Sequence, residues 1–538
     1  MLKRISVLMT ILVLTACVFL TACIPSSEGD GVNKDPHPVS KTLLNTSIGN
    51  AQALDKNDYI YTEWQNLEQK LSAAELVAAN DAATQVQINE AKAYLDIAMY
   101  ELVPDDMAKI DWTKRAEDYN AAFVEKFIRT IGTARYVLEY TYNSSGSTTQ
   151  QSYLWPHFCT LIMQYRMVQL DPSEENISLY KQLLDGMEYF RNAGTPIIGT
   201  GPIKYNSGRS SSVASGRGDV FYDDNIWVAR GFMLAYETYN NLAEITEEVD
   251  LKAEYEANAA TYKDRAKRVT DFVNSGWSTE LGGLYWNETG ATGANPSADA
   301  LERGLSANGA SIILNAWVHK TFSEDSNFED ADGKEYIEWA YDFYEFCNRL
   351  QDPVSYIYYN GIHTVINGGN REDGEINRAL YAYNSGSMIL ADIYLYEVTQ
   401  EEDHLVNARR SAAIAFEVYC ADFEEGMGIS NLTNDPWFDS VLVDAFQELY
   451  PYDKGNVSVY LDKYAKSFDY GYVNGMDKNE EFAGTKSITG LLPTNVISGF
   501  AAEVNLDAFV RDRSALTQSG NTDMIIMIAN YYANVLQK

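Results

Sequence analysis

Two adjacent carboxylates, Asp223 and Asp224, are the side chains of this sequence best suited to chemistry. They lie in the run Phe-Tyr-Asp-Asp-Asn-Ile-Trp (221–227), which follows a loop rich in glycine and serine (208–218) and opens a strongly apolar helical pattern. Glycoside hydrolysis needs two carboxyl groups, one that protonates the leaving oxygen and one that attacks or activates water. Two close carboxylates resist ionising together, so one of them keeps a proton to donate near neutral pH.

Acidic residues at a helix start also have an ordinary explanation, because they cap free backbone N–H groups and complement the helix dipole. Side chains of helical neighbours point about 100° apart, but a residue at the first turn is still partly non-helical, so both carboxyls can face one cleft. Asp223, Asp224 and Asn225 offer oxygen ligands for calcium, yet the D-x-D-x-D-G loop is absent. The five histidines are scattered and no Gly-Lys-Ser/Thr phosphate loop occurs. We therefore expect neither a metal nor a cofactor.

Helices must position this pair, because apolar residues recur at helical spacing in almost every long segment. We expect about twelve helices in succession, preceded by two more near residues 58–73 and 84–103. The twelve segments lie near 117–141, 153–170, 175–191, 223–243, 252–275, 302–322, 333–350, 379–400, 403–420, 438–450, 456–468 and 521–536.

This succession predicts an all-α fold, an (α/α)6 toroid of six helical hairpins with an extra N-terminal helical hairpin. Long links at about 192–222, 277–301, 351–378 and 468–520 are expected to gather at one end and form a cleft. A superhelical array of hairpins is the alternative, but the sequence has no internal repeat of the required period.

The run from Tyr222 to Asn225, followed by Trp227, resembles the signature of the family 76 glycoside hydrolases. These are (α/α)6 enzymes that cut α-1,6-mannan with retention of configuration. Further pieces that resemble the family in the same order, between about Arg115 and Tyr450, are Gly282–Trp286, Ser306–Gly309, Asp352-Pro353 with Asn360–Ile362, and Tyr381–Gly386. The sequence departs from the family at Val228, at Ser385 and in the glycine-aromatic loop (Gly282–Trp286). These departures leave the acidic pair unchanged, but the arrangement of the sugar subsites stays undetermined.

The resemblance implies that Asp223 is the nucleophile and Asp224 the general acid/base of an endo-acting α-1,6-mannanase. It also gives candidates for the cleft lining, each of which has a structural alternative as a helix cap or core residue: Tyr222, Asn225, Trp286, Asn308, Tyr383 and Asn384. The expected partner is an α-mannan polysaccharide.

Two other functions compete with this interpretation. A non-catalytic glycan-binding surface lipoprotein would share the lipid anchor, the helices and the aromatic residues. An (α/α)6 enzyme acting on uronic acids would need a basic pocket, for which Arg209, Arg217 and Arg303 are the candidates.

The N-terminus reads as a lipoprotein signal peptide over residues 1–23. A basic start and an apolar run end in Leu-Thr-Ala-Cys, where Cys23 is the expected lipidation site; the same four letters occur at Cys17, and a single uncleaved membrane anchor is the alternative. A flexible tether (24–50) and the enzyme domain (51–538, with a helical extension over 51–110) follow. We expect a protein on the bacterial cell surface or the periplasmic side of the membrane, anchored by lipid beside glycan-uptake proteins.

The overall composition restricts the partners further. The net charge of −35, from 76 acidic and 41 basic residues, disfavours binding to nucleic acid or to anionic polymers. Cys159, Cys347 and Cys420 are too widely spaced to suggest a disulfide framework or a CxxC site. The 38 tyrosines and 9 tryptophans pack helices for the most part, but amphipathic rings also suit a sugar-binding cleft.

Overall fold

The computed structural model describes residues 39–56, 59, 61–100, 102, 106–140, 150–195, 199–293, 296–322, 329–330, 333–422, 428–430, 432, 435–475, 491–492 and 514–535. The chain divides into two compact units, one made of residues 1–52 and 70–97 and one made of 53–69 and 98–538. Both lipidation candidates, Cys17 and Cys23, lie outside the described residues.

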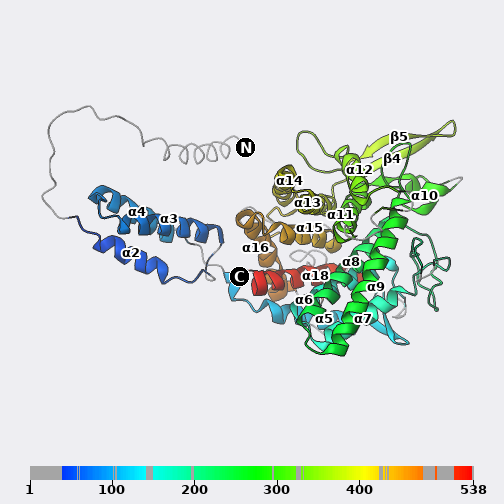
Figure 1. The fold of residues 1–538 in the computed structure, drawn as a ribbon, viewed down its shortest axis with the longest axis horizontal. Coiled ribbons are helices and arrows are strands. Elements are labelled where there is room, and N and C mark those ends of the chain that lie inside the picture. The colour runs from blue at the N-terminus through cyan, green and yellow to red at the C-terminus, as the bar shows by residue number, and fades with distance from the viewer. Residues whose placement is uncertain are drawn as a thin grey trace. The chain divides into compact units, whose positions relative to one another are not determined.

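The smaller unit contains α2 (Thr42–Gln52), the second half of α3 (Tyr61–Ala79) and most of α4 (Gln85–Tyr100) (Figure 1). Leu44, Ala74, Ile88 and Leu95 are buried and form its core. The structure thus adds a third helix, α2, to the two helices expected in the N-terminal extension.

The tether prediction over 24–50 is wrong at its C-terminal end, since α2 begins at Thr42. Its buried face runs through Leu44, Ser47 and Ala51, and this stripe is hard to read from the sequence because it contains a serine.

Among its described residues, the larger unit contains twelve long helices that match the expected succession. They are α5 (Trp112–Phe127), α6 (Leu154–Leu170), α7 (Glu174–Met187), α8 (Tyr222–Ile245), α9 (Val249–Asn274), α11 (Leu305–Phe322), α12 (Tyr336–Asn348), α13 (Ala382–Thr399), α14 (Glu402–Tyr419), α15 (Pro436–Leu449), α16 (Lys454–Tyr470) and α18 (Ala515–Asn530). Short helical pieces accompany them: η2 (Asp106–Lys109), α10 (Glu288–Thr292), η3 (Asp299–Leu301), η4 (Gly471–Gly475) and η7 (Tyr531–Val535).

Alternate helices form a closed inner ring, which confirms the (α/α)6 toroid. In order around the ring, α6 packs on α8, followed by α11, α13, α15 and α18, and α18 returns to α6 (Figure 1). The other six helices lie outside this ring. Almost every residue of α11 and α18 is buried, as a helix surrounded by other helices requires. The outer helix α9 instead buries one stripe through Tyr255, Ala259, Tyr262 and Ala266.

A buried ion network ties the inner helices together. Arg166 on α6 pairs with Asp444 on α15 at 2.7 Å and with Asp523 on α18 at 2.9 Å. Arg230 on α8 also pairs with Asp444. Because each charge is buried, removing one partner would leave the others uncompensated in the interior.

The strands belong to the links between helices. β1 (Ile128–Ile131) pairs antiparallel with β2 (Ala134–Val137), and β3 (Arg303–Gly304), β4 (Gly361–Asn367) and β5 (Asn370–Asn377) form an antiparallel sheet in that order. The helix expected over 117–141 is therefore wrong beyond Phe127. Gly132, with a φ of 58°, makes the turn that reverses the chain.

The links that enter the inner helices are long and the links that leave them are mostly short. Residues 188–221, 275–304 and 349–381 precede α8, α11 and α13, whereas 246–248 and 400–401 follow α8 and α13. Much of the last predicted long link, 468–520, lies outside the described residues. Within the described ranges, no helix has the length and apolar character needed to cross a bilayer.

Candidate active site

The second residue of every inner helix lines one cleft. These residues are Trp155 on α6, Asp223 on α8, Ser306 on α11, Tyr383 on α13, Trp437 on α15 and Leu516 on α18. The six inner helices therefore present their N-terminal ends to the same space. Free backbone N–H groups and the positive ends of the helix dipoles favour negative charge there.

The two carboxyls of Asp223 and Asp224 lie in the first turn of α8 and face this cleft. Both are partly accessible to solvent, yet protein surrounds them closely. The Oδ1 atom of Asp223 is buried without a hydrogen bond from any described residue.

The pKa values of the two carboxyls are raised to different levels. Burial raises the pKa of Asp223 to about 6. Hydrogen bonds from the side chains of Ser306, Trp286 and Trp227 act in the opposite direction and lower it in part. Burial raises the pKa of Asp224 to about 8, and the negative charge of Asp223 adds to this. Near pH 7 the pair therefore holds one ionised and one protonated carboxyl, which is the combination that acid–base chemistry with a nucleophile needs.

The cleft has a volume of about 540 Å³ and walls rich in aromatic side chains. The described residues that line it are Glu139, Tyr153, Trp155, Pro156, Phe158, Ser207, Asp219, Phe221, Asp223, Asp224, Trp227, Trp286, Ser306, Tyr383, Trp437, Phe438 and Leu516. Every charged residue of this lining is acidic. Such a site suits a neutral, hydroxyl-rich molecule whose C–H faces stack on the rings.

Trp286 connects the glycine-aromatic loop to the start of α8. Its backbone carbonyl accepts a hydrogen bond from Tyr222 N at 3.0 Å, and its N–H donates to Glu302 O at 2.9 Å. Its ring packs against Phe221 with centroids 4.8 Å apart and remains 38% exposed. The loop thus fixes the residue that precedes Asp223 while it offers an aromatic face to the cleft.

The model of glycosyl hydrolase family 76 matches residues 136–483, well over half of the chain. The chain belongs to this family.

Solved structures agree with the assignment at the level of the fold. A family 76 glycoside hydrolase from a bovine strain of Bacteroides thetaiotaomicron is 18% identical, with 80% of each chain covered and a TM-score of 0.59. An inactive variant of an α-1,6-mannanase from a Salegentibacter species, in complex with α-1,6-mannotriose, is 18% identical, with 78% of this chain and 99% of that chain covered and a TM-score of 0.52.

One curated protein shares a short stretch with this chain. The zinc metalloprotease ZmpB of Streptococcus pneumoniae is 42% identical over 65 residues, which are 12% of this chain. The chain spans only 3% of the length of that relative, so its activity says nothing about this family 76 enzyme.

Four of the eight predicted site residues meet in the family 76 cleft: Asp223, Asp224, Trp286 and Tyr383. Tyr222, Asn225, Asn308 and Asn384 are not among the described residues that line it. Tyr222 points into the core, where its ring stacks on Phe272 with centroids 4.9 Å apart.

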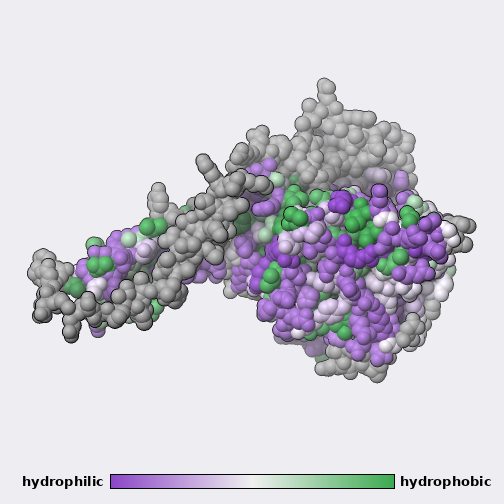
Figure 2. All heavy atoms as spheres, turned by 90° about the horizontal axis from the view of Figure 1, so that it is seen from above, coloured by the Kyte–Doolittle hydropathy of each residue, from purple (hydrophilic) through white to green (hydrophobic). Residues whose placement is uncertain are grey.

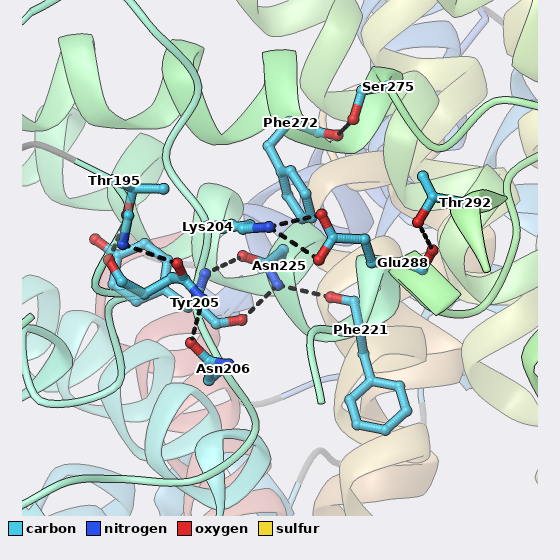
Figure 3. Close-up of polar contacts among 12 residues, drawn as sticks. Thr195, Lys204, Tyr205, Asn206, Phe221, Asn225, Phe272, Ser275, Glu288 and Thr292 are labelled. Carbon is cyan, nitrogen blue, oxygen red and sulfur yellow. Dashed lines mark hydrogen bonds and ion pairs between the residues drawn. The ribbon is translucent and has the colours of Figure 1, made fainter. Parts of the chain in front are cut away.

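Asn225 fastens a loop to the helix that carries the acidic pair (Figure 3). Its Oδ1 accepts from Tyr205 N at 2.8 Å, and its Nδ2 donates to Tyr205 O at 2.9 Å and to Phe221 O at 2.6 Å. The amide side chain therefore pairs with the backbone of Tyr205 as a neighbouring strand would. The ion pair of Lys204 with Glu288 lies next to this clamp.

Asn308 repeats the same arrangement on α11. Its Oδ1 accepts from Leu284 N at 2.8 Å, and its Nδ2 donates to Gly304 O at 2.6 Å. Asn384 on α13 donates to Asn360 Oδ1 at 3.4 Å. All three asparagines are fully buried, and their hydrogen bonds hold loops that precede the inner helices.

The three arginines considered for a basic pocket lie outside the cleft lining. Arg303 is fully buried and bonds to Asp373 and Thr364, and Arg209 lies over the rings of Tyr136 and Tyr189. The prediction of a possible uronic-acid pocket is therefore wrong. Within the described ranges, no group of three or more His, Cys, Asp or Glu residues is arranged to hold a metal ion.

Sequence reasoning missed most of the lining, above all Trp155, Ser306, Trp437 and Phe438. Their shared signal is position, since each lies within the first three residues of an inner helix. The closed ring of inner helices makes the first residues of each helix face the cleft. A sequence prediction that located each helix start to within one residue would therefore have identified these four residues.

Proposed function

We propose that this family 76 glycoside hydrolase cleaves α-1,6-linked mannan internally and with retention of configuration. The observation that carries the proposal is the pair of cleft-facing carboxyls, Asp223 and Asp224, whose pKa values of about 6 and about 8 bracket neutral pH. The closed ring of helix starts and the aromatic walls support a polysaccharide as the substrate.

In the first step, the protonated Asp224 donates its proton to the glycosidic oxygen as that bond breaks, and the ionised Asp223 attacks the anomeric carbon. A mannosyl ester on Asp223 and a shortened glycan chain result. In the second step, Asp224 removes a proton from water, the water oxygen attacks the same carbon, and the ester bond to Asp223 breaks. Asp224 thereby regains its proton and both carboxyls return to their starting states.

Two independent observations support this substrate. The Salegentibacter relative is named an α-1,6-mannanase, and its inactive variant, which binds α-1,6-mannotriose, carries asparagine in place of aspartate at two consecutive positions. The present cleft is acidic throughout its charged lining, which suits a neutral mannan and disfavours an anionic glycan.

We further propose that the enzyme is a lipoprotein attached through Cys23 on the bacterial surface or the periplasmic side of the membrane, beside proteins that take up the released glycans. The apolar run that ends in Leu-Thr-Ala-Cys supports this location. The hydrophilic residues that predominate on the described surface in Figure 2 suit contact with water around such an anchored body.

Product analysis of the soluble chain, starting near Asp35, on unbranched α-1,6-mannan tests the proposed function. We expect manno-oligosaccharides of several lengths, and NMR of the first products should show the α-anomer before mutarotation. Release of mannose alone would contradict internal cleavage, and an initial β-anomer would contradict retention. Binding without any cleavage would favour the glycan-binding alternative.

A further inference from the structure

Three further aromatic side chains line the cleft. Trp155 comes from α6, Phe438 from α15, and Tyr153 directly precedes α6. In the closed ring of six inner helices, α15 is the third neighbour of α8 in either direction. Phe438 therefore faces the catalytic carboxyls from the opposite side of the cleft mouth.

These rings continue a row that begins beside Asp223. Burial is the main reason why the pKa of the Tyr383 phenol is raised. The negative charge of the nearby Asp223 carboxylate raises it further. The ring of Tyr383 contacts Phe438 with centroids 4.3 Å apart. Phe438 and Trp155 follow with centroids 6.3 Å apart and planes inclined by only 16°. The row thus leads from the reacting centre across the cleft.

The outer end of the row is held firmly by backbone hydrogen bonds. Tyr153 N donates to Glu139 Oε2 at 3.3 Å, and Leu154 N donates to Ser207 O at 2.8 Å. Glu139 is fixed in turn, because its carbonyl accepts from Ala515 N at the start of α18 at 3.0 Å. The backbone that carries Tyr153 and Trp155 is therefore fixed before a ligand arrives, which lowers the entropy cost of binding.

The exposure of these groups fits a surface that awaits a ligand. Tyr153 is 59% exposed, and Trp155 and Glu139 are half-buried. Flat rings next to a carboxylate match a pyranose, since the rings stack on C–H faces while the carboxylate accepts hydrogen bonds from hydroxyl groups.

We propose that Tyr153, Trp155, Phe438 and Glu139 form a distal subsite for a further neutral hexopyranose unit of the glycan being cleaved. Trp155 and Phe438 supply the stacking faces, Tyr153 borders them, and Glu139 accepts a sugar hydroxyl. This inference rests on the proposed function and adds that the enzyme recognises its substrate well beyond the scissile bond. Binding energy gained there helps orient the reacting unit, so longer chains are cleaved more efficiently.

The test is kcat/KM on linear α-1,6-manno-oligosaccharides of increasing length, for the parent enzyme, Trp155→Ala, Tyr153→Ala and Trp155→Phe. A matched control is Tyr341→Ala, because Tyr341 is 36% exposed on the outer helix α12 and does not line the cleft. Thermal unfolding of each variant shows whether it is folded.

We expect the ratio of kcat/KM between the longest and the shortest cleaved substrate to fall about fivefold or more in both alanine variants. Trp155→Phe should restore part of the ratio and Tyr341→Ala should keep it. An equal loss at every length, or an unchanged ratio in both alanine variants, would overturn the distal subsite. Failure of the parent enzyme to cleave any length would instead overturn the proposed function, and this inference with it.

Discussion

Trp227 on α8 packs edge to face against Trp437 on α15, with ring centroids 5.2 Å apart. Both indoles are almost fully buried and both line the cleft. Because α8 and α15 lie opposite each other in the inner ring, this contact closes the floor of the cleft beside the acidic pair. Burial is the main reason why the pKa of Asp224 is raised, and the two indoles are part of the protein that surrounds this cleft.

Trp437→Ala should therefore destabilise the fold and lower the pKa of Asp224. Loss of a buried indole leaves a cavity and lowers the free energy of unfolding by about 3–5 kcal/mol. Water entering that cavity lowers the pKa of Asp224, so the basic limb of the activity profile moves to lower pH. Denaturant unfolding and the pH dependence of kcat/KM measure the two effects. Trp286→Ala is the control for stability, since a ring 38% exposed at the rim leaves no buried cavity.

The pH dependence of the parent enzyme should be bell-shaped. Below a pH of about 6, Asp223 takes up a proton and can no longer attack, so kcat/KM falls. Above a pH of about 8, Asp224 loses the proton that it must donate, so kcat/KM falls again. Measurement of kcat/KM between pH 4 and 10 checks this. A rate that stays constant through pH 8 and above would exclude Asp224 as the acid.

Ser306→Ala should shift only the acidic limb. The hydroxyl of Ser306 lowers the pKa of Asp223, so its removal raises that pKa and the enzyme loses activity at a higher pH on the acid side. The matched control is Ser178→Ala, because Ser178 is exposed on the outer helix α7. A shift of the basic limb instead would mean that Ser306 acts on Asp224.

Asn225→Ala should destabilise the site without removing any group that touches a ligand. The variant leaves Tyr205 N and Tyr205 O without partners in the interior, which costs about 1–3 kcal/mol for each unsatisfied group, whereas Phe221 O keeps the bond from Asn225 N. We expect lower thermal stability and lower kcat, since the clamp holds the turn that carries the acidic pair. Asn241→Ala, at an exposed position on the same helix, should change neither. A rise in KM alone would contradict this role and indicate that Asn225 contacts the ligand.

Sequence periodicity predicted the helices well because the inner helices are apolar on all sides and the outer helices carry one clear stripe. It failed at 128–137, where Ile131 continues the spacing of Phe123 and Phe127 although Gly132 turns the chain into a hairpin. Spacing reports which residues are apolar, but a turn depends on one residue that tolerates a positive φ.

The candidate site was predictable only in part. Asp223 and Asp224 can be recognised in the sequence because they are two adjacent charges at the start of an apolar helix. The amide of Asn225 looks equally suited to sugar binding, and only its backbone partner Tyr205, distant by twenty positions, reveals its structural role. Trp155 and Phe438 come from different helices, so their meeting depends on ring closure, which no local pattern encodes.

The most direct test of the division of labour between Asp223 and Asp224 compares their asparagine variants on mannan and on an aryl α-mannoside with an acidic leaving group. On mannan, both Asp223→Asn and Asp224→Asn should lose a factor of about 10² to 10⁴ or more in kcat. The activated aryl group needs no proton to leave, so Asp224→Asn should still release a burst of phenol and accumulate the glycosyl ester, whereas Asp223→Asn should release none. A burst from Asp223→Asn, or equal activity of both variants on the aryl substrate, would contradict the account.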